Sequence, residues 1–163
     1  MTEERLKKVL EEHKKWLKTR FTIYPEGRRA YLGGANLEEA DLRGVLYDEN
    51  TAMYALACPE KGAFTGFKKA GGYIVELLIP STAKRSSATT RKCRCSEAEV
   101  ISITEMDGSK TDIKSVASNF DSDFVYIVGE KAVVSNFDED RWNECSAGIH
   151  FFITRDEAVR YKC

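Results

Sequence analysis

Several features that would assign the chain to a common class are missing from the sequence. None of its apolar runs approaches the ~18 to 20 residues that a bilayer-spanning helix needs, so we expect no membrane as a partner. Residues 1–20 are charged throughout, which is not the pattern of a secretory signal peptide. The five cysteines are an odd number in a chain with no sign of export, so we expect reduced thiols in a cytoplasmic protein.

Signatures of catalysis and of metal binding are missing as well. There is no Gly-Lys-Ser/Thr phosphate loop, no G-x-G-x-x-G and no H-E-x-x-H, which argues against the commonest nucleotide hydrolases and dehydrogenases. Cys93 and Cys95 are separated by one residue and lack the paired C-x-x-C spacing of a zinc ribbon. We therefore assign no catalytic residue, expect neither a cofactor nor a metal ion, and predict a binding protein rather than an enzyme.

Charge of one sign is not in excess, but the charges are segregated along the chain. The 25 Lys and Arg residues nearly balance the 26 Asp and Glu residues, which argues against a protein that coats nucleic acid. Residues 67–94 nevertheless carry seven basic residues against one acidic residue, a net of +6. Residues 95–145 carry twelve acidic residues against four basic ones, a net of −8.

The N-terminal region combines a helical pattern with a short repeat. Apolar residues at helical spacing between Leu6 and Leu17 predict an amphipathic helix over 2–18, with Thr2 as its N-cap. Residues 30–44 form three five-residue units, AYLGG, ANLEE and ADLRG, each with Ala first and Leu third. A period of five fits neither a helix nor a strand. Three units are also too few to form a free-standing solenoid, so they must dock on another part of the chain.

The remainder of the chain predicts β-structure. Val, Ile, Phe and Tyr are concentrated in short segments separated by Gly-containing turns, and Thr154–Glu157 fits the capping box of a short last helix. The fold class is therefore α+β: an N-terminal amphipathic helix and a pentapeptide stub in 1–50, then a mainly antiparallel β domain with a short C-terminal helix in 51–163. The predicted strands are Met53–Ala57, Ala63–Lys68, Tyr73–Ile79, Val100–Thr104, Phe124–Val128, Ala132–Val134 and Ile149–Ile153.

The five-residue units resemble the pentapeptide repeat, which forms a right-handed β-solenoid. The chain also resembles a group of bacteriophage and prophage proteins in which such repeats precede an uncharacterised C-terminal domain. The matching segments are His13–Leu17, Arg29–Gly44, Ile79–Arg94, Phe137–Trp142 and Glu144–Thr154. The resemblance implies a phage origin, and hence the cytoplasm of an infected bacterial cell, but it supplies no activity.

The segment Ser81–Arg94 is the main candidate for a binding site. It combines five basic residues with six serines and threonines and contains no acidic residue. Hydroxyls, backbone N–H groups and arginine side chains are the groups that bind phosphate or carboxylate oxygens. We predict ligand contacts from Lys84, Arg85, Ser86, Ser87, Arg91, Lys92 and Arg94. The alternative is a solvated loop that pairs with the acidic block of residues 95–145, within the chain or across a dimer contact.

Two further residues are predicted to face the ligand. Trp142 follows an acidic run in an expected loop and is the best candidate for stacking on a base. His150 lies on an expected strand, where a neutral imidazole binds a polar ligand or is simply part of the core. Cys145 lies five residues before His150, but the pair is only a weak signal for a nucleophile and its base.

These observations favour three functions in descending order. The first is a non-catalytic phage accessory protein, expected to be a homo-oligomer, that captures a small anionic, nucleotide-like molecule and sequesters a host immune signal as an anti-defence sponge. The second is a protein-interaction module in which the N-terminal helix and stub engage a host protein. The third is an ADP-ribosyltransferase-like enzyme, suggested faintly by the strand–Gly–x–His–aromatic pattern.

Overall fold

The computed structural model describes residues 2–28, 30, 47–48 and 53–162, which fall into two compact units. The N-terminal unit contains the described residues up to Tyr54, and the C-terminal unit contains residues 55–162. The three pentapeptide units lie outside the described residues, with the exception of Ala30. Neither helix in the described part of the chain is both long and apolar enough to traverse a lipid bilayer.

The N-terminal unit is built on α1 (Glu3–Thr19), which confirms the helix predicted here. Thr2 is its N-cap, and the Thr2 side chain accepts a hydrogen bond from the Arg5 amide, as expected for a threonine at this position. The Thr19 hydroxyl accepts a hydrogen bond of 2.8 Å from the amide of Glu26 and so closes the loop that follows the helix.

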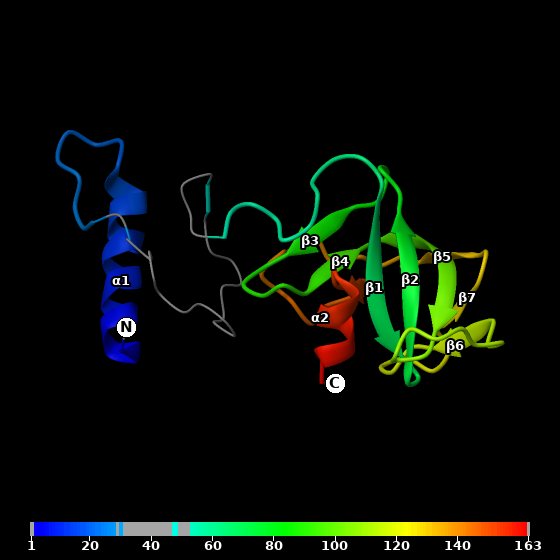
Figure 1. Ribbon diagram of the computed structural model, residues 1–163. Coiled ribbons are helices and arrows are strands. Elements are labelled where there is room, and N and C mark those ends of the chain that lie inside the picture. The colour runs from blue at the N-terminus through cyan, green and yellow to red at the C-terminus, as the bar shows by residue number, and fades with distance from the viewer. Residues whose placement is uncertain (1, 29, 31–46, 49–52, 163) are drawn as a thin grey trace. The chain divides into compact units, whose positions relative to one another are not determined.

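The C-terminal unit begins with a four-stranded antiparallel sheet (Figure 1). Its strands are β1 (Phe64–Ala70), β2 (Tyr73–Ile79), β5 (Glu97–Thr104) and β8 (Lys131–Val133), in the order β1-β2-β5-β8. A turn at Gly71–Gly72 joins β1 to β2, with a positive φ at both glycines.

Two smaller sheets complete the β-structure of the C-terminal unit. One contains β3 (Arg85–Ser87), β4 (Cys93–Cys95) and β9 (Ile149–Phe151), and the other pairs β6 (Ser115–Ala117) with β7 (Val125–Ile127). The last helix, α2 (Arg155–Arg160), begins at the predicted capping box between Thr154 and Glu157. The fold is α+β and mostly β, as expected.

Hydrogen bonds link the first two sheets into a closed circuit. Phe67 and Phe152 exchange two backbone hydrogen bonds of 2.7 and 2.8 Å, which join β1 to the end of β9. On the other side, β4 continues through Ser96 into β5, so one bent strand belongs to both sheets. The enclosed core is formed by apolar side chains with little or no exposure, among them Val75, Leu77, Ile79, Cys93, Cys95, Val100, Ile149 and Phe151.

The structure corrects the expected strand Met53–Ala57, none of which is in a strand. Met53 has a φ of 64°, a left-handed conformation that an extended strand does not tolerate. Conversely, β3, β4 and β6 are strands that the sequence analysis did not predict. Each is three residues long, and β3 and β4 carry arginine and serine side chains, so their pattern is not that of an apolar strand.

Gly66 is required by close packing inside β1. A Cβ at this position would lie 2.6 Å from Phe151 Cδ2 and 3.1 Å from Ile79 Cδ1. We expect Gly66→Ala to lower the free energy of unfolding by about 2 kcal/mol through overpacking. Urea unfolding followed by circular dichroism measures the effect, and Gly62→Ala is a partial control because its Cβ would meet nothing within 4 Å, although its φ of 76° adds a strain of its own.

Candidate functional site

A pocket of about 630 Å³ lies among the three sheets of the C-terminal unit. Lys68 and Lys69 enter it from β1, Tyr126 from β7 and His150 from β9. Its remaining walls come from the residue before β4, the residues between β6 and β7, those after β8, those on both sides of β9 and the residue after α2. They include Lys92, Phe120, Asp121, Phe124, Asn136, Cys145, Ser146, Ala147, Gly148, Phe152 and Tyr161.

Three lysines give the pocket its positive charge. Lys68 is 7% exposed, donates a hydrogen bond of 3.2 Å to the His150 carbonyl and lies 5.6 Å from the centre of the Tyr126 ring. Lys69 Nζ donates to the Tyr161 carbonyl at 3.2 Å, and Lys92 Nζ lies 3.8 Å from Cys145 Sγ.

Few carboxylates lie near Lys69 and Lys92 in the described part of the chain. Asp121 is the acidic residue among the described residues that line the cavity. Within the described part of the chain, neither Lys69 nor Lys92 has a carboxylate at ion-pair distance. A partly enclosed site with this excess of ammonium groups attracts anions.

His150 adds a neutral polar group to the pocket. Burial lowers the pKa of its imidazole to about 4, and the nearby charges of Lys68, Lys92 and Arg94 act in the same direction. Its Nε2 lies 2.9 Å from the Glu144 carbonyl oxygen. Because a carbonyl oxygen only accepts, Nε2 carries the ring proton and Nδ1 remains an acceptor.

Aromatic rings form two parts of the pocket wall. Phe124 and Tyr126 meet edge to face with centroids 5.3 Å apart, and Phe152 and Tyr161 lie 5.2 Å apart. Phe120 is 73% exposed and therefore has a free ring face. Rings of this kind stack on the planar base of a nucleotide.

The predicted residues Ser86, Arg94 and His150 are brought into register across β3, β4 and β9. Arg94 is 2% exposed, and its guanidinium donates to the carbonyl oxygens of Asp138 at 3.0 Å, Ala147 at 2.8 Å and Asp140 at 3.0 Å. The Arg94 side chain therefore holds the loop 137–147 against the sheet.

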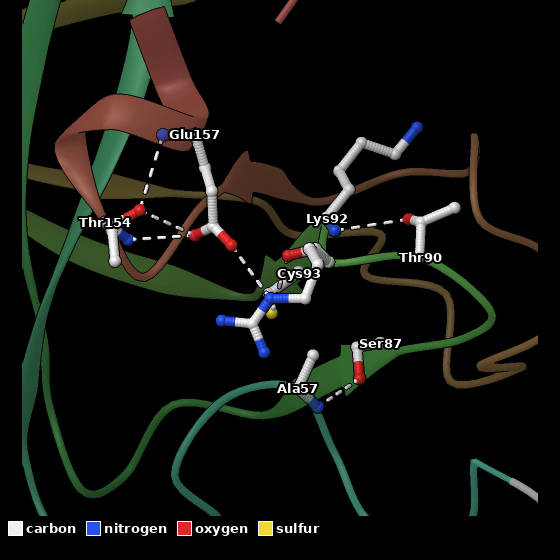
Figure 2. A network of polar contacts seen from close by, with 8 residues as sticks. Ala57, Ser87, Thr90, Lys92, Cys93, Thr154 and Glu157 are labelled. Atoms are coloured by element: carbon white, nitrogen blue, oxygen red, sulfur yellow. Dashed lines mark hydrogen bonds and ion pairs between the residues drawn. The ribbon is translucent and has the colours of Figure 1, made fainter. Parts of the chain in front are cut away.

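Three other predicted basic residues, Lys84, Arg85 and Arg91, bind groups of the chain itself. Arg85 donates to the carbonyls of Pro59, Gly62 and Pro80 at 2.9, 2.6 and 2.8 Å. Lys84 pairs with Glu139 on the surface, and Arg91 pairs with Glu157 at 2.8 Å. Figure 2 shows the Glu157 carboxylate, which also closes the capping box with Thr154.

The remaining predicted residues lie away from the pocket lining. Ser87 Oγ accepts a hydrogen bond of 2.8 Å from the Ala57 amide (Figure 2). Ser86 Oγ is buried with no hydrogen-bond partner among the described residues. Trp142 is 6% exposed, and the Arg141 guanidinium lies 4.8 Å from its ring centre. Of the predicted ligand residues, Lys92 and His150 line the pocket.

Lys68 and Lys69 are pocket residues that the sequence analysis did not assign to a site. They were counted in the basic segment, but two lysines in a strand look like ordinary solvent-facing charges. The low exposure of Lys68 depends on elements that follow it by about 50 to 80 residues in the chain. Two neighbouring lysines in a strand that also contains Phe64, Phe67 and Ala70 are the signal that could have identified them.

The cysteines do not form a metal site in the described part of the chain, where no three His, Cys, Asp or Glu side chains come close enough to hold an ion. Cys58 and Cys93 share a hydrogen bond, and burial raises the pKa of Cys95 to about 12. The same hydrogen bond raises the pKa of Cys93 and lowers that of Cys58. Cys93 and Cys95 therefore stay protonated, and all three side chains are packed in the core. Of the four described cysteines, Cys145 is the exposed one, and it lines the pocket.

Comparison with known proteins assigns the chain to a family but not to an activity. Residues 54–158 match the family of unknown function DUF5758, and the match spans all the strands described above. The chain belongs to this family. No curated protein and no solved structure matches it.

Proposed function

We propose that the C-terminal unit binds a small anionic, nucleotide-like molecule in the pocket and holds it without chemical change. The observation that carries the proposal is the convergence of Lys68, Lys69 and Lys92 with the neutral His150 in one cavity of about 630 Å³. Cavities that hold small ligands typically measure about 300 to 1,000 Å³.

The lysines of the pocket suit the phosphate end of such a ligand, and its aromatic rings suit the base. The ammonium groups of Lys69 and Lys92 are placed to bind a phosphate group, since the described residues provide no carboxylate partner for either. The exposed ring of Phe120 and the nearby Phe124 offer a stacking surface for a base. His150 Nδ1 is available as an acceptor for a ribose hydroxyl or a base N–H.

The biological role that fits such a site is sequestration. The resemblance to phage proteins suggests an infected bacterial cell, in which capture of a nucleotide immune signal by a sponge protein would protect the phage. Retention without turnover is all that this role requires, and His150 already donates its ring proton to the chain's own Glu144 carbonyl.

Binding of AMP, measured by calorimetric titration, tests the proposal. We expect Lys69→Ala and Lys92→Ala each to weaken binding about tenfold or more, because each variant removes a charge-assisted contact. Lys84→Ala is the matched control: it removes a lysine from the same basic segment, but one that pairs with Glu139 outside the pocket. AMP should be recovered unchanged after incubation. Equal affinities in all four proteins, or no binding of AMP, cyclic nucleotides and ADP-ribose, would contradict the proposal.

A second candidate function, protein interaction, is favoured by one observation in the N-terminal unit. Phe21, Ile23 and Tyr24 follow α1 and are 89%, 88% and 86% exposed. Neighbouring exposed apolar side chains are typical of docking surfaces. If this function is correct, substituting serine at all three positions abolishes binding to a host protein and leaves nucleotide affinity unchanged.

A further inference from the structure

The residues between β3 and β4 form a cradle that is filled by the chain's own carboxylate. Glu144 Oε1 accepts hydrogen bonds from the Thr89 amide at 2.6 Å, the Thr89 hydroxyl at 2.9 Å and the Thr90 amide at 3.3 Å. Glu144 Oε2 lies 3.5 Å from the Thr90 hydroxyl. Two backbone N–H groups and two hydroxyls directed at one anion are the arrangement that binds phosphate in proteins.

The cradle lies close in the chain to two residues that line the pocket, Lys92 and Cys145. The Thr90 hydroxyl accepts a hydrogen bond of 3.2 Å from the amide of Lys92, as Figure 2 shows, and the Lys92 side chain lines the pocket. Glu144, whose carboxylate fills the cradle, is followed directly by Cys145, which also lines the pocket. Cys145 Sγ lies 3.8 Å from Lys92 Nζ. Lys92 and Cys145 therefore link the cradle to the lining of the pocket.

Glu144 also begins a segment that covers part of the pocket. Residues 145–148 all line the cavity, and we call residues 143–148 the strap. The strap is attached to the sheet by the Glu144 carboxylate in the cradle, by the Glu144 carbonyl at His150 Nε2, and by the Ala147 carbonyl at Arg94. Release of the carboxylate frees one of these three attachments.

We propose that Glu144 is an internal substitute for a phosphate group of the ligand. On this basis the pocket takes a nucleotide with at least two phosphate groups, one bound by Lys69 and Lys92 and the other in the Thr89–Thr90 cradle after Glu144 has left it. This inference rests on the proposed function and adds the number of phosphate groups. A phosphate offers more acceptor oxygens than a carboxylate, and the displaced Glu144 gains solvent.

Titration of AMP and ADP into the full chain and into Glu144→Gln tests the inference. Glutamine keeps an acceptor for the cradle but no charge, so it competes less well with a phosphate group. We expect the affinity for ADP to rise about tenfold and the affinity for AMP to change less than about twofold. Glu139→Gln is the matched control, because it removes an acidic charge five residues away that pairs with Lys84 on the surface.

A second measurement keeps the test independent of how the variant folds. Inorganic pyrophosphate added to the unaltered protein should raise amide hydrogen exchange in residues 143–148, because the strap loses the Glu144 attachment. If both nucleotides bind but Glu144→Gln leaves their affinity ratio unchanged, this inference is overturned and the proposed function stands. If neither nucleotide binds and pyrophosphate leaves exchange in the strap unchanged, both are overturned.

Discussion

Replacing Arg94 with alanine is expected to lower the free energy of unfolding of the C-terminal unit by about 3 to 5 kcal/mol. Arg94 is 2% exposed, and its guanidinium donates hydrogen bonds of 2.8 to 3.0 Å to the carbonyl oxygens of Asp138, Asp140 and Ala147. Hydrogen bonds from a charged donor contribute more than neutral ones, and the variant leaves three acceptors facing a void. Urea unfolding at neutral pH measures the loss.

Two further variants show whether the stability contributed by Arg94 comes from the several hydrogen bonds of its planar guanidinium or from its positive charge. Arg94→Lys keeps the charge but reaches at most one or two of the three carbonyls, so it should recover only a minor part of the stability. Arg91→Ala is the matched control, because Arg91 lies three residues away and forms an exposed pair with Glu157. Its loss should cost less than about 1 kcal/mol. Equal losses for Arg91→Ala and Arg94→Ala would show that the loop 137–147 is not held by Arg94.

Lowering the pH from 7.5 to 5 is expected to cost the C-terminal unit about 2 kcal/mol of stability through His150. Its pKa of about 4 in the folded protein lies below the value of about 6.5 expected for the unfolded chain. Between these two values the unfolded state takes up a proton that the folded state does not, so stability is complete above pH 6.5 and declines as the pH falls towards 4. The neighbours Lys68, Lys92 and Arg94 oppose the charged imidazole throughout this range.

His150→Gln isolates this contribution to the pH dependence. Glutamine retains an N–H that can reach the Glu144 carbonyl, but it has no proton to gain. The stability difference between the variant and the unaltered protein, measured by urea unfolding at several pH values, should change by about 2 kcal/mol between pH 7.5 and 5. Because both proteins contain His13, its titration cancels in the comparison. A difference that is constant with pH would refute the assignment.

The sequence predicted those elements whose local pattern agrees with their final environment. The helix after Thr2, the capping box at Thr154 and the strand Tyr73–Ile79 were predictable because capping chemistry and apolar spacing act over a few residues. The strands β3 and β4 were not, since Ser86, Ser87 and Arg94 are polar residues that become buried only after distant segments cover them. Burial of this kind depends on tertiary contacts and produces no periodic spacing of apolar residues in the sequence.

The chemistry of the segment Ser81–Arg94 was predictable, whereas the identity of its partners was not. Its hydroxyls, amides and guanidinium groups do bind oxygen atoms, but many of these belong to the chain: the Glu144 carboxylate in the cradle, the carbonyls at Arg94 and the Glu157 carboxylate at Arg91. The alternative prediction was that this segment pairs with the acidic block of residues 95–145. The ion pair between Lys84 and Glu139 is such a contact. The type of a side chain specifies which groups it can bind, and only the fold determines which of them lies within hydrogen-bond distance.

The hydrogen-bonded circuit has a consequence for how copies of the chain can associate. Exposed sheet edges invite other chains to add strands, which leads to aggregation. In the described part of the molecule, β1 is joined to the end of β9 through Phe67 and Phe152, and the outer strands β3, β6, β7 and β8 are three residues long. These short edges offer few backbone groups for strand addition. If the predicted homo-oligomer forms through the C-terminal unit, its contacts must come from side-chain surfaces and not from extension of a sheet between copies.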